Sequence, residues 1–272
     1  MCACRGTAGF AHVSCLAEQA KILIEEVEEN NLGYKRWNER WGRWSTCSLC
    51  EQEYHGVVAC ALGWACWKTY VGRHGAQKLA ISVLATGLYE AGRHEESLSV
   101  GEAELSMLRR LGASKESMLA TQSNNANTYQ LLGRLEDALR MQKDVYSGYL
   151  KLNGAEYGDT LVAAYNYALS LAELQRFEEA KTLLRKTMPV ARRVLSESND
   201  TTLRMRWVYA KALYLDPAAT LDNIREAVTT LEDTARTARR VLGGAQPTAE
   251  VIEGALRNAR AALRASEASS SA

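Results

Sequence analysis

Six cysteine and histidine residues near the start of the chain form three closely spaced pairs. The pairs are Cys2-x-Cys4, His12-x-x-Cys15 and Cys47-x-x-Cys50. Zinc in proteins is held by four thiolate or imidazole ligands at the corners of a tetrahedron, and two ligands from one tight turn can fill two of those corners. This spacing therefore predicts that the segment binds Zn²⁺.

The alternative interpretation is that the cysteines are buried without a metal, because a free cysteine often packs as a small apolar residue. It suits Cys60 and Cys66 better than the paired positions, since these two lie six residues apart in an apolar stretch and do not share a helix face. All seven cysteines fall in the first 66 residues. The start of the chain lacks the pattern of a secretory signal, so we expect a cytoplasmic protein, with a nuclear one as the alternative, in which clustered cysteines indicate metal rather than disulfides.

The order of the three pairs resembles the RING-CH, or RING-variant, zinc finger. Residues 4–16 are similar to that family's third to sixth ligands, and residues 47–54 to its last pair. The resemblance implies a cross-brace with one complete site and one half site. The complete site would comprise Cys2, Cys4, Cys47 and Cys50, and the half site His12 and Cys15. The family's first pair would lie upstream of Met1, so we expect either a longer protein or a second metal that is weakly held or lost.

Several departures from the family count against ubiquitin-ligase activity. RING-CH fingers contact a ubiquitin-conjugating enzyme through an apolar residue in the first pair, an aromatic residue after the sixth ligand and often a proline after the last. Here the first pair is absent, residues 16–21 contain no aromatic residue, and Glu51 follows Cys50. The 31-residue spacer is also long, and its tryptophan-rich stretch 37–44 is expected to pack over the zinc or the first helix.

A repeated pattern then occupies most of the chain. The sequence LYEAGRHEESL at 88–98 is echoed by YQLLGRLEDAL at 129–139 and LAELQRFEEA at 171–180. Aligned on Gly92, Gly133 and Gln175, the copies are 41 and 42 residues apart, which is the length of two helices and two turns. The segments that follow, 95–111, 136–152 and 178–195, have apolar residues at helical spacing. Each copy is therefore a predicted helical hairpin.

A fourth hairpin and a closing helix are predicted beyond the third copy. The fourth unit has helices at 202–214 and 221–242, and Pro247 takes a favourable first-turn position for a last helix that reaches about residue 265. Pro189 falls inside the third unit's second helix, where it should kink the helix or remove one hydrogen bond. No hairpin can bury its apolar stripe alone, so the units must stack, with the first helices lining a concave face.

These repeats resemble tetratricopeptide proteins, in particular the 42-residue form of kinesin light chains. The match is best from Thr160-Leu161 to Glu178-Glu179-Ala180, and at 242–248. The resemblance implies an all-α, right-handed solenoid of antiparallel hairpins that binds a protein or peptide in its groove. The family's groove asparagine falls on Asn124 and Asn166, whose carboxamides could pair with the backbone of an extended ligand. The alternative is that both are ordinary exposed helix residues.

The predicted domains are a partial finger at 1–54, an apolar connecting helix at 55–76, repeats at 77–265 and a disordered tail at 266–272. The 33 Lys and Arg residues nearly balance 32 Asp and Glu residues, which argues against partners such as nucleic acid or a membrane surface. No phosphate-binding loop, nucleophile elbow or metalloprotease motif is present. We therefore expect a binding adaptor rather than an enzyme, with a ubiquitin ligase whose repeats select substrate as the alternative.

Overall fold

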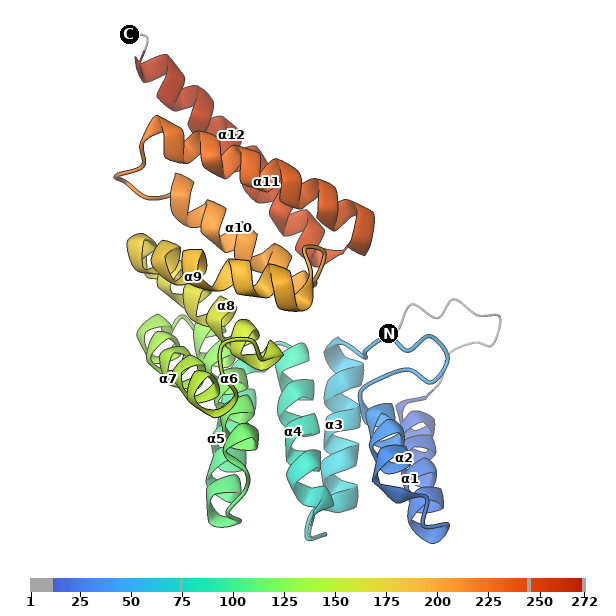
Figure 1. Ribbon diagram of the computed structural model, residues 1–272. Coiled ribbons are helices and arrows are strands. Elements are labelled where there is room, and N and C mark those ends of the chain that lie inside the picture. Colours follow the sequence, from blue (N-terminus) through green and yellow to red (C-terminus); the bar gives the residue numbers. More distant parts are fainter. Residues whose placement is uncertain (1–11, 74, 244–245, 271–272) are drawn as a thin grey trace. The chain divides into compact units, whose positions relative to one another are not determined.

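A computed structural model describes residues 12–73, 75–243 and 246–270, and within these ranges the chain is helical apart from turns and one isolated antiparallel bridge between Thr46 and Glu53. The all-α prediction is confirmed (Figure 1). The chain divides into two compact units, Met1–Gly133 and Arg134–Ala272, which are described separately below. No described helix combines the length and apolar character needed to cross a membrane.

The described part of the first unit contains six α-helices and one short 3-10 helix. They are α1 (Val13–Glu29), α2 (Gly33–Trp41), η1 (Gly42–Trp44), α3 (Gly56–Tyr70), α4 (Ala76–Glu90), α5 (His94–Arg110) and α6 (Lys115–Leu131). Neighbouring helices from α3 to α6 pack in sequence order, each against the next. This is the arrangement expected of stacked hairpins.

Aromatic side chains fill the core between α1, α2, η1 and α3. Trp37 and Trp41 stack with ring centroids 4.8 Å apart, and Trp41 and Trp44 both contact the ring of Tyr70. Trp44 and Tyr70 are almost completely buried, with Ala20 and other residues of α1 in the same cluster. The expectation that the tryptophan-rich stretch covers the first helix is confirmed.

Helices α3 and α4 approach each other so closely that their backbones touch at two glycines. A β-carbon added to Gly87 would lie 2.5 Å from the carbonyl oxygen of Ala59, and one added to Gly63 would lie 3.0 Å from the Cα of Leu84. Only glycine fits such a contact. The helix predicted as a connector at 55–76 is therefore more than a connector, because α3 forms a tightly packed pair with the first repeat helix.

The repeated turn has the same backbone and the same ion pair in each copy. Gly92, Gly133 and Gln175 all have positive φ, at 73°, 72° and 57°. The arginine that follows is the N-cap residue of the next helix and binds an acidic side chain three residues on, in the pairs Arg93–Glu96, Arg134–Asp137 and Arg176–Glu179. Glycine adopts this conformation cheaply, which explains two of the three residues.

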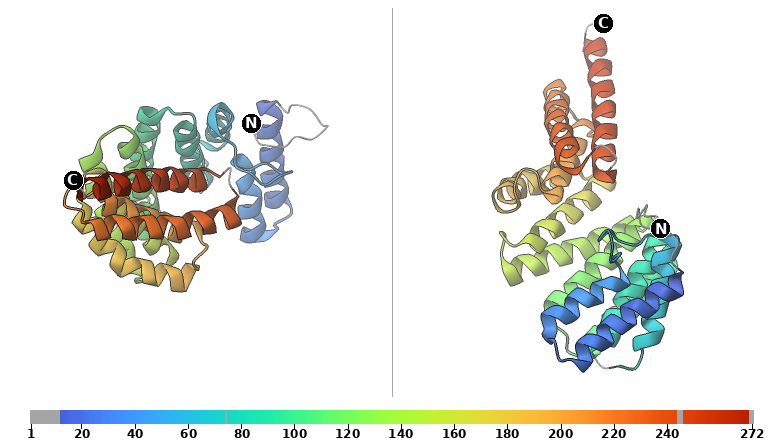
Figure 2. Two further views of the ribbon diagram at one scale, coloured as in Figure 1. Left: turned by 90° about the horizontal axis from the view of Figure 1, so that it is seen from above. Right: turned by 90° about the vertical axis from the view of Figure 1, so that its right-hand side faces the viewer.

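The described residues of the second unit form six helices, with one core along their length. They are α7 (Leu135–Asn153), α8 (Gly158–Glu173), α9 (Phe177–Leu195), α10 (Asp200–Tyr214), α11 (Leu221–Leu242) and α12 (Pro247–Ser270). Helices α11 and α12 run side by side (Figure 1 and Figure 2). Direct contacts also join α8, the first helix of the third hairpin, to α10, the first helix of the fourth, and α10 to the closing helix α12. The predicted third and fourth hairpins are confirmed.

One expectation about this unit needs correction. Helix α12 continues to Ser270, so residues 266–270 are helical where a disordered tail was predicted; residues 271–272 lie outside the described ranges. Helix α9 runs from Phe177 to Leu195 as one helix through Pro189. Proline still removes one backbone donor there, but it does not divide the helix.

A buried ion pair closes the long turn of the fourth hairpin. Lys181 Nζ on α9 lies 2.8 Å from Asp216 Oδ2 and 2.6 Å from Glu178 Oε1. The Lys181 and Asp216 side chains are only 5% and 10% exposed. The backbone N–H of Ala218 also donates to Asp216, so this carboxylate fixes the turn that the sequence places around Pro217.

Candidate functional site

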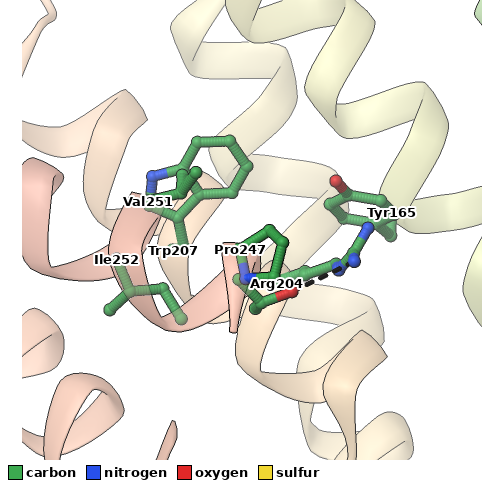
Figure 3. Close-up of a pocket in the computed structure, with 7 residues that line it drawn as sticks. Tyr165, Arg204, Trp207, Pro247, Val251 and Ile252 are labelled. Atoms are coloured by element: carbon green, nitrogen blue, oxygen red, sulfur yellow. Dashed lines mark hydrogen bonds between the residues drawn. The ribbon is translucent and has the colours of Figure 1, made fainter. Parts of the chain in front are cut away.

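A pocket in the second unit lies among the first helices of two hairpins, α8 and α10, and the closing helix α12. Tyr165 comes from α8, Arg204 and Trp207 come from α10, and the remaining wall comes from the start of α12 (Figure 3). The α12 residues are Pro247, Thr248, Val251 and Ile252. The cavity measures about 250 Å³, and the predicted groove of a repeat array would be lined by the same set of helices.

The guanidinium of Arg204 is the charged group of this pocket. It lies 2.7 Å from the Asp200 carboxylate, donates to Thr248 Oγ1 at 3.0 Å and sits 6.0 Å from the centre of the Tyr165 ring. Burial raises the pKa of Tyr165, which keeps its phenol neutral at physiological pH. The pocket thus joins aromatic and aliphatic walls to one positioned cation (Figure 3).

Tyr165 and Trp207 occupy equivalent positions of successive repeats, because they are 42 residues apart (207 − 165) and the second and third turns are separated by the same interval. Their helical spacing alone indicates core packing. Tyr165 does belong to the core and Trp207 packs against it, yet both also line the pocket. The overlooked signal is the repetition of an aromatic residue at one repeat position.

The two predicted groove residues fall in different units. Asn124 is exposed on α6 of the first unit, and Asn166 is half-buried on α8 of the second, next to Tyr165. The backbone carbonyl of each accepts a hydrogen bond within its own helix, from Thr128 and from Ser170. Their exposure is compatible with ligand contact, while Val208, at the equivalent position of the fourth unit, is fully buried.

The described zinc-ligand candidates form two separate pairs. His12 is the N-cap residue of α1, and Cys15 is exposed in the first turn of that helix. Cys47 is buried and Cys50 half-buried. Within residues 12–73, the described side chains include no group of three His, Cys, Asp or Glu residues that could hold a metal ion. Cys2 and Cys4 lie outside the described ranges.

The Cys47–Cys50 segment forms a tight turn around a sulfur atom. The N–H of Leu49 donates to Cys47 Sγ at 3.4 Å, and the N–H of Glu51 donates to the Cys47 carbonyl at 3.0 Å. Glu51 has a positive φ of 56°, and the Thr46–Glu53 bridge closes the loop. An N–H that points at sulfur stabilises thiolate character, so the turn fits a metal-binding pair.

Comparisons with known proteins agree on the repeats. The family model described as tetratricopeptide repeat matches residues 118–156 and 160–200. A crystal structure of nearly identical TPR-like repeats, from a Podosopora anserina protein assigned as a kinesin light chain, is 18% identical, with 85% of this chain and 98% of that chain covered and a TM-score of 0.54. The crystal structure of BtubC (BKLC) from P. vanneervenii is 15% identical, with 95% and 88% covered and a TM-score of 0.57.

Among curated proteins, no sequence matches this chain. The two structural similarities are below 20% identity, so they describe the fold. The family match adds the repeat type in the centre of the chain, where the predicted second and third units lie. Residues 118–156 and 160–200 of this chain are therefore tetratricopeptide repeats, in an all-helical repeat fold similar to that of the two solved structures.

Proposed function

We propose that the protein is an interaction scaffold that binds a partner peptide through the pocket of Tyr165, Arg204 and Trp207. The observation that supports this most strongly is that α8, α10 and α12 together form the pocket, with an aromatic residue at the same repeat position of α8 and α10. A repeat fold by itself does not define a binding site. This pocket adds a concave surface of mixed apolar and charged character, which is typical of ligand sites.

The chemistry of the wall specifies the kind of residue that would enter. Trp207 and Val251 offer apolar surface that is not fully covered, since Val251 is 46% exposed. Arg204 is already paired with Asp200, so it would donate to a neutral acceptor such as a peptide carbonyl more readily than attract a second carboxylate. We infer an apolar side chain inserted beside Trp207, with a backbone carbonyl of the same peptide facing Arg204.

A peptide-library selection on the full chain tests this function. Binders are expected to share an apolar anchor residue, and Trp207→Ala should weaken them about tenfold or more, as expected for an aromatic anchor. Trp64→Ala is the matched control, because Trp64 is a partly exposed tryptophan on α3 of the other unit. Binders that lose no affinity on Trp207→Ala, or that lose as much on Trp64→Ala, would refute the site.

The asparagine contacts predicted from the sequence extend this proposal. Asn166 follows Tyr165 in α8, so a peptide held in the pocket would also contact the Asn166 carboxamide. Asn124, on α6, would contact the peptide on the first unit. Alanine at both positions should reduce affinity for the selected peptide. Unchanged capture by the double variant would remove both asparagines from the site while leaving the pocket test intact.

We also propose that the amino-terminal segment binds Zn²⁺ through Cys47 and Cys50 together with Cys2 and Cys4. The turn that directs the Leu49 N–H at Cys47 Sγ supports this assignment. The resemblance to RING-CH fingers depends on ligand spacing alone. The tetratricopeptide family model matches residues 118–156 and 160–200, which lie outside the cysteine segment.

Metal analysis of freshly purified, reduced protein tests the zinc site. About one zinc per chain is expected, and Cys47→Ser should remove it while Cys66→Ser, in the aromatic core, should not. A metal-free wild-type protein would contradict the proposal. Autoubiquitination assays with a panel of conjugating enzymes would separate an adaptor, which stays inactive, from a ligase.

A further inference from the structure

A second pocket, in the first unit, is polar and has two deeply buried polar side chains in its wall. It measures about 190 Å³ and lies among α4, α5 and α6. Glu104 is 6% exposed and Asn125 is 3% exposed. The other residues that line it are Ser82, Ala85, Thr86, Tyr89, Glu90, Ser97, Asn124, Asn127 and Thr128.

Two carboxyl groups, Glu90 and Glu104, line the pocket, and burial raises the pKa of Glu104. Glu104 accepts hydrogen bonds from the hydroxyls of Ser82 and Thr121, but neither donor is charged. Glu90, at the edge, is 2.7 Å from His55 Nδ1. No lysine or arginine is among the lining residues. Burying a carboxylate without a cation is costly, so the site favours a positively charged group beside Glu104.

Asn125 contributes a hydrogen-bond donor that is not used within the described residues. Its Nδ2 is buried and has no acceptor there, and its Oδ1 faces Gly101. A buried N–H₂ group without a partner costs about 1–3 kcal/mol. A molecule that occupies the pocket would therefore gain by presenting a carbonyl oxygen to Asn125.

We propose that this pocket binds a primary ammonium group with an adjacent carbonyl, as found at the free amino terminus of a peptide, with the ammonium against Glu104 and the carbonyl accepting from Asn125. Glu104 then has a cationic partner, and the Asn125 side-chain N–H₂ group has a hydrogen-bond acceptor. The cavity of about 190 Å³ has room for such a group, since about 10–15 Å³ of cavity volume is enough for one water molecule. The proposal does not depend on the apolar pocket of the second unit, which has different residues and a different ligand.

Three small probes distinguish the contribution of the ammonium group to binding from that of the carbonyl group. Alanyl-alanine amide carries both groups, its N-acetylated form lacks the ammonium, and n-butylamine has the ammonium of a lysine side chain without the carbonyl. Titration into ¹⁵N-labelled full chain, followed through the Asn125 side-chain amide signal, should show saturable shifts with the first probe only. Equal shifts with the acetylated probe would overturn the ammonium assignment, and stronger binding of n-butylamine would overturn the amino-terminal one.

Two variants then test the named residues. Glu104→Gln should weaken alanyl-alanine amide about tenfold or more, since it removes the charge and keeps the shape. Glu95→Gln, on the exposed start of α5, is the matched control. If Glu104→Gln does not fold, Asn125→Ala still tests the site. The titration is then followed through backbone amide signals of α6, and the variant should weaken the binding of alanyl-alanine amide. Undiminished affinity in either folded variant would refute the site.

Discussion

The amide oxygen of Asn125 lies in the space that a side chain at residue 101 would occupy. A β-carbon built on Gly101 would come within 2.0 Å of Asn125 Oδ1 and 3.0 Å of its Cγ. Both residues are buried where α5 packs on α6. The absence of a side chain at residue 101 therefore determines where the Asn125 carboxamide sits, and with it the donor side of the polar pocket.

Gly101→Ala is expected to displace Asn125 and reshape the polar pocket. Alanine favours a helix by up to about 1 kcal/mol over glycine, but forced overpacking costs about 1–3 kcal/mol. We expect a net loss of about 1 kcal/mol in the free energy of unfolding, measured in urea. Gly254→Ala on α12 is the control, because its nearest neighbour is the flexible end of Arg257 at 3.7 Å, and it should be neutral or stabilising. A stabilised Gly101→Ala protein would contradict the packing argument.

Asp216→Asn should destabilise the second unit by about 2 kcal/mol. Removal of one member of a buried ion pair costs about 3–5 kcal/mol, and Glu178 reduces that cost here because it also binds Lys181. Urea unfolding measures the change. Glu178→Gln is the matched control and should cost less than about 1 kcal/mol, since the Glu178 side chain is 75% exposed. Equal effects of the two variants would show that the buried contact has no special role.

The same pair predicts how stability depends on pH. The hydrogen bond from Lys181 lowers the pKa of Asp216 below its ordinary value of 3.8, so this contribution is complete above that pH and is lost as pH falls through the lowered pKa. Burial lowers the pKa of Lys181, but its bonds to Asp216 and Glu178 raise it overall, so the alkaline loss begins only above 10.5. Below pH 3.8, the free energy of unfolding should depend less on pH in Asp216→Asn than in the wild type, as measured by unfolding at a series of acidic pH values.

Gly87→Ala should separate α3 from α4. The added carbon would lie 2.5 Å from the carbonyl oxygen of Ala59. A backbone atom cannot relieve this clash by a change of rotamer, as a side chain could. A loss of about 2–3 kcal/mol is expected, at the upper end for overpacking. Amide hydrogen exchange in α3 measures it locally and should accelerate more than exchange in α9. Unchanged protection of α3 would mean that the two helices tolerate a wider spacing.

The repeats could be predicted from the sequence because each local signal pointed to the same structure. The positive φ of Gly92 and Gly133, the acidic first turns and the apolar spacing all agree with the observed hairpins. The arginine ion pair of each turn was missed, since it depends on side-chain geometry across a helix start. The close pairing of α3 with α4 was missed for a similar reason, because glycines within an apolar helix do not identify the backbone that approaches them.

The sites were harder to predict than the fold. Asn124 stood out through a family pattern, whereas its neighbour Asn125 has the buried, unused donor. Trp207 belongs both to the packing of α10 and to a pocket wall, and spacing alone cannot divide those roles. Which polar groups share a cavity is set by packing between helices, and this information is absent from any single helix pattern.

Direct backbone contact at Gly63 and Gly87 makes α3 and α4 a single rigid body, since neither helix can slide past the other without first moving apart. Leu62 on α3 packs against Cys47 and Tyr54, and Ser82 on α4 donates a hydrogen bond to Glu104. A movement of α3 and α4 together would therefore displace the contacts of both the cysteine turn and the Glu104 carboxylate.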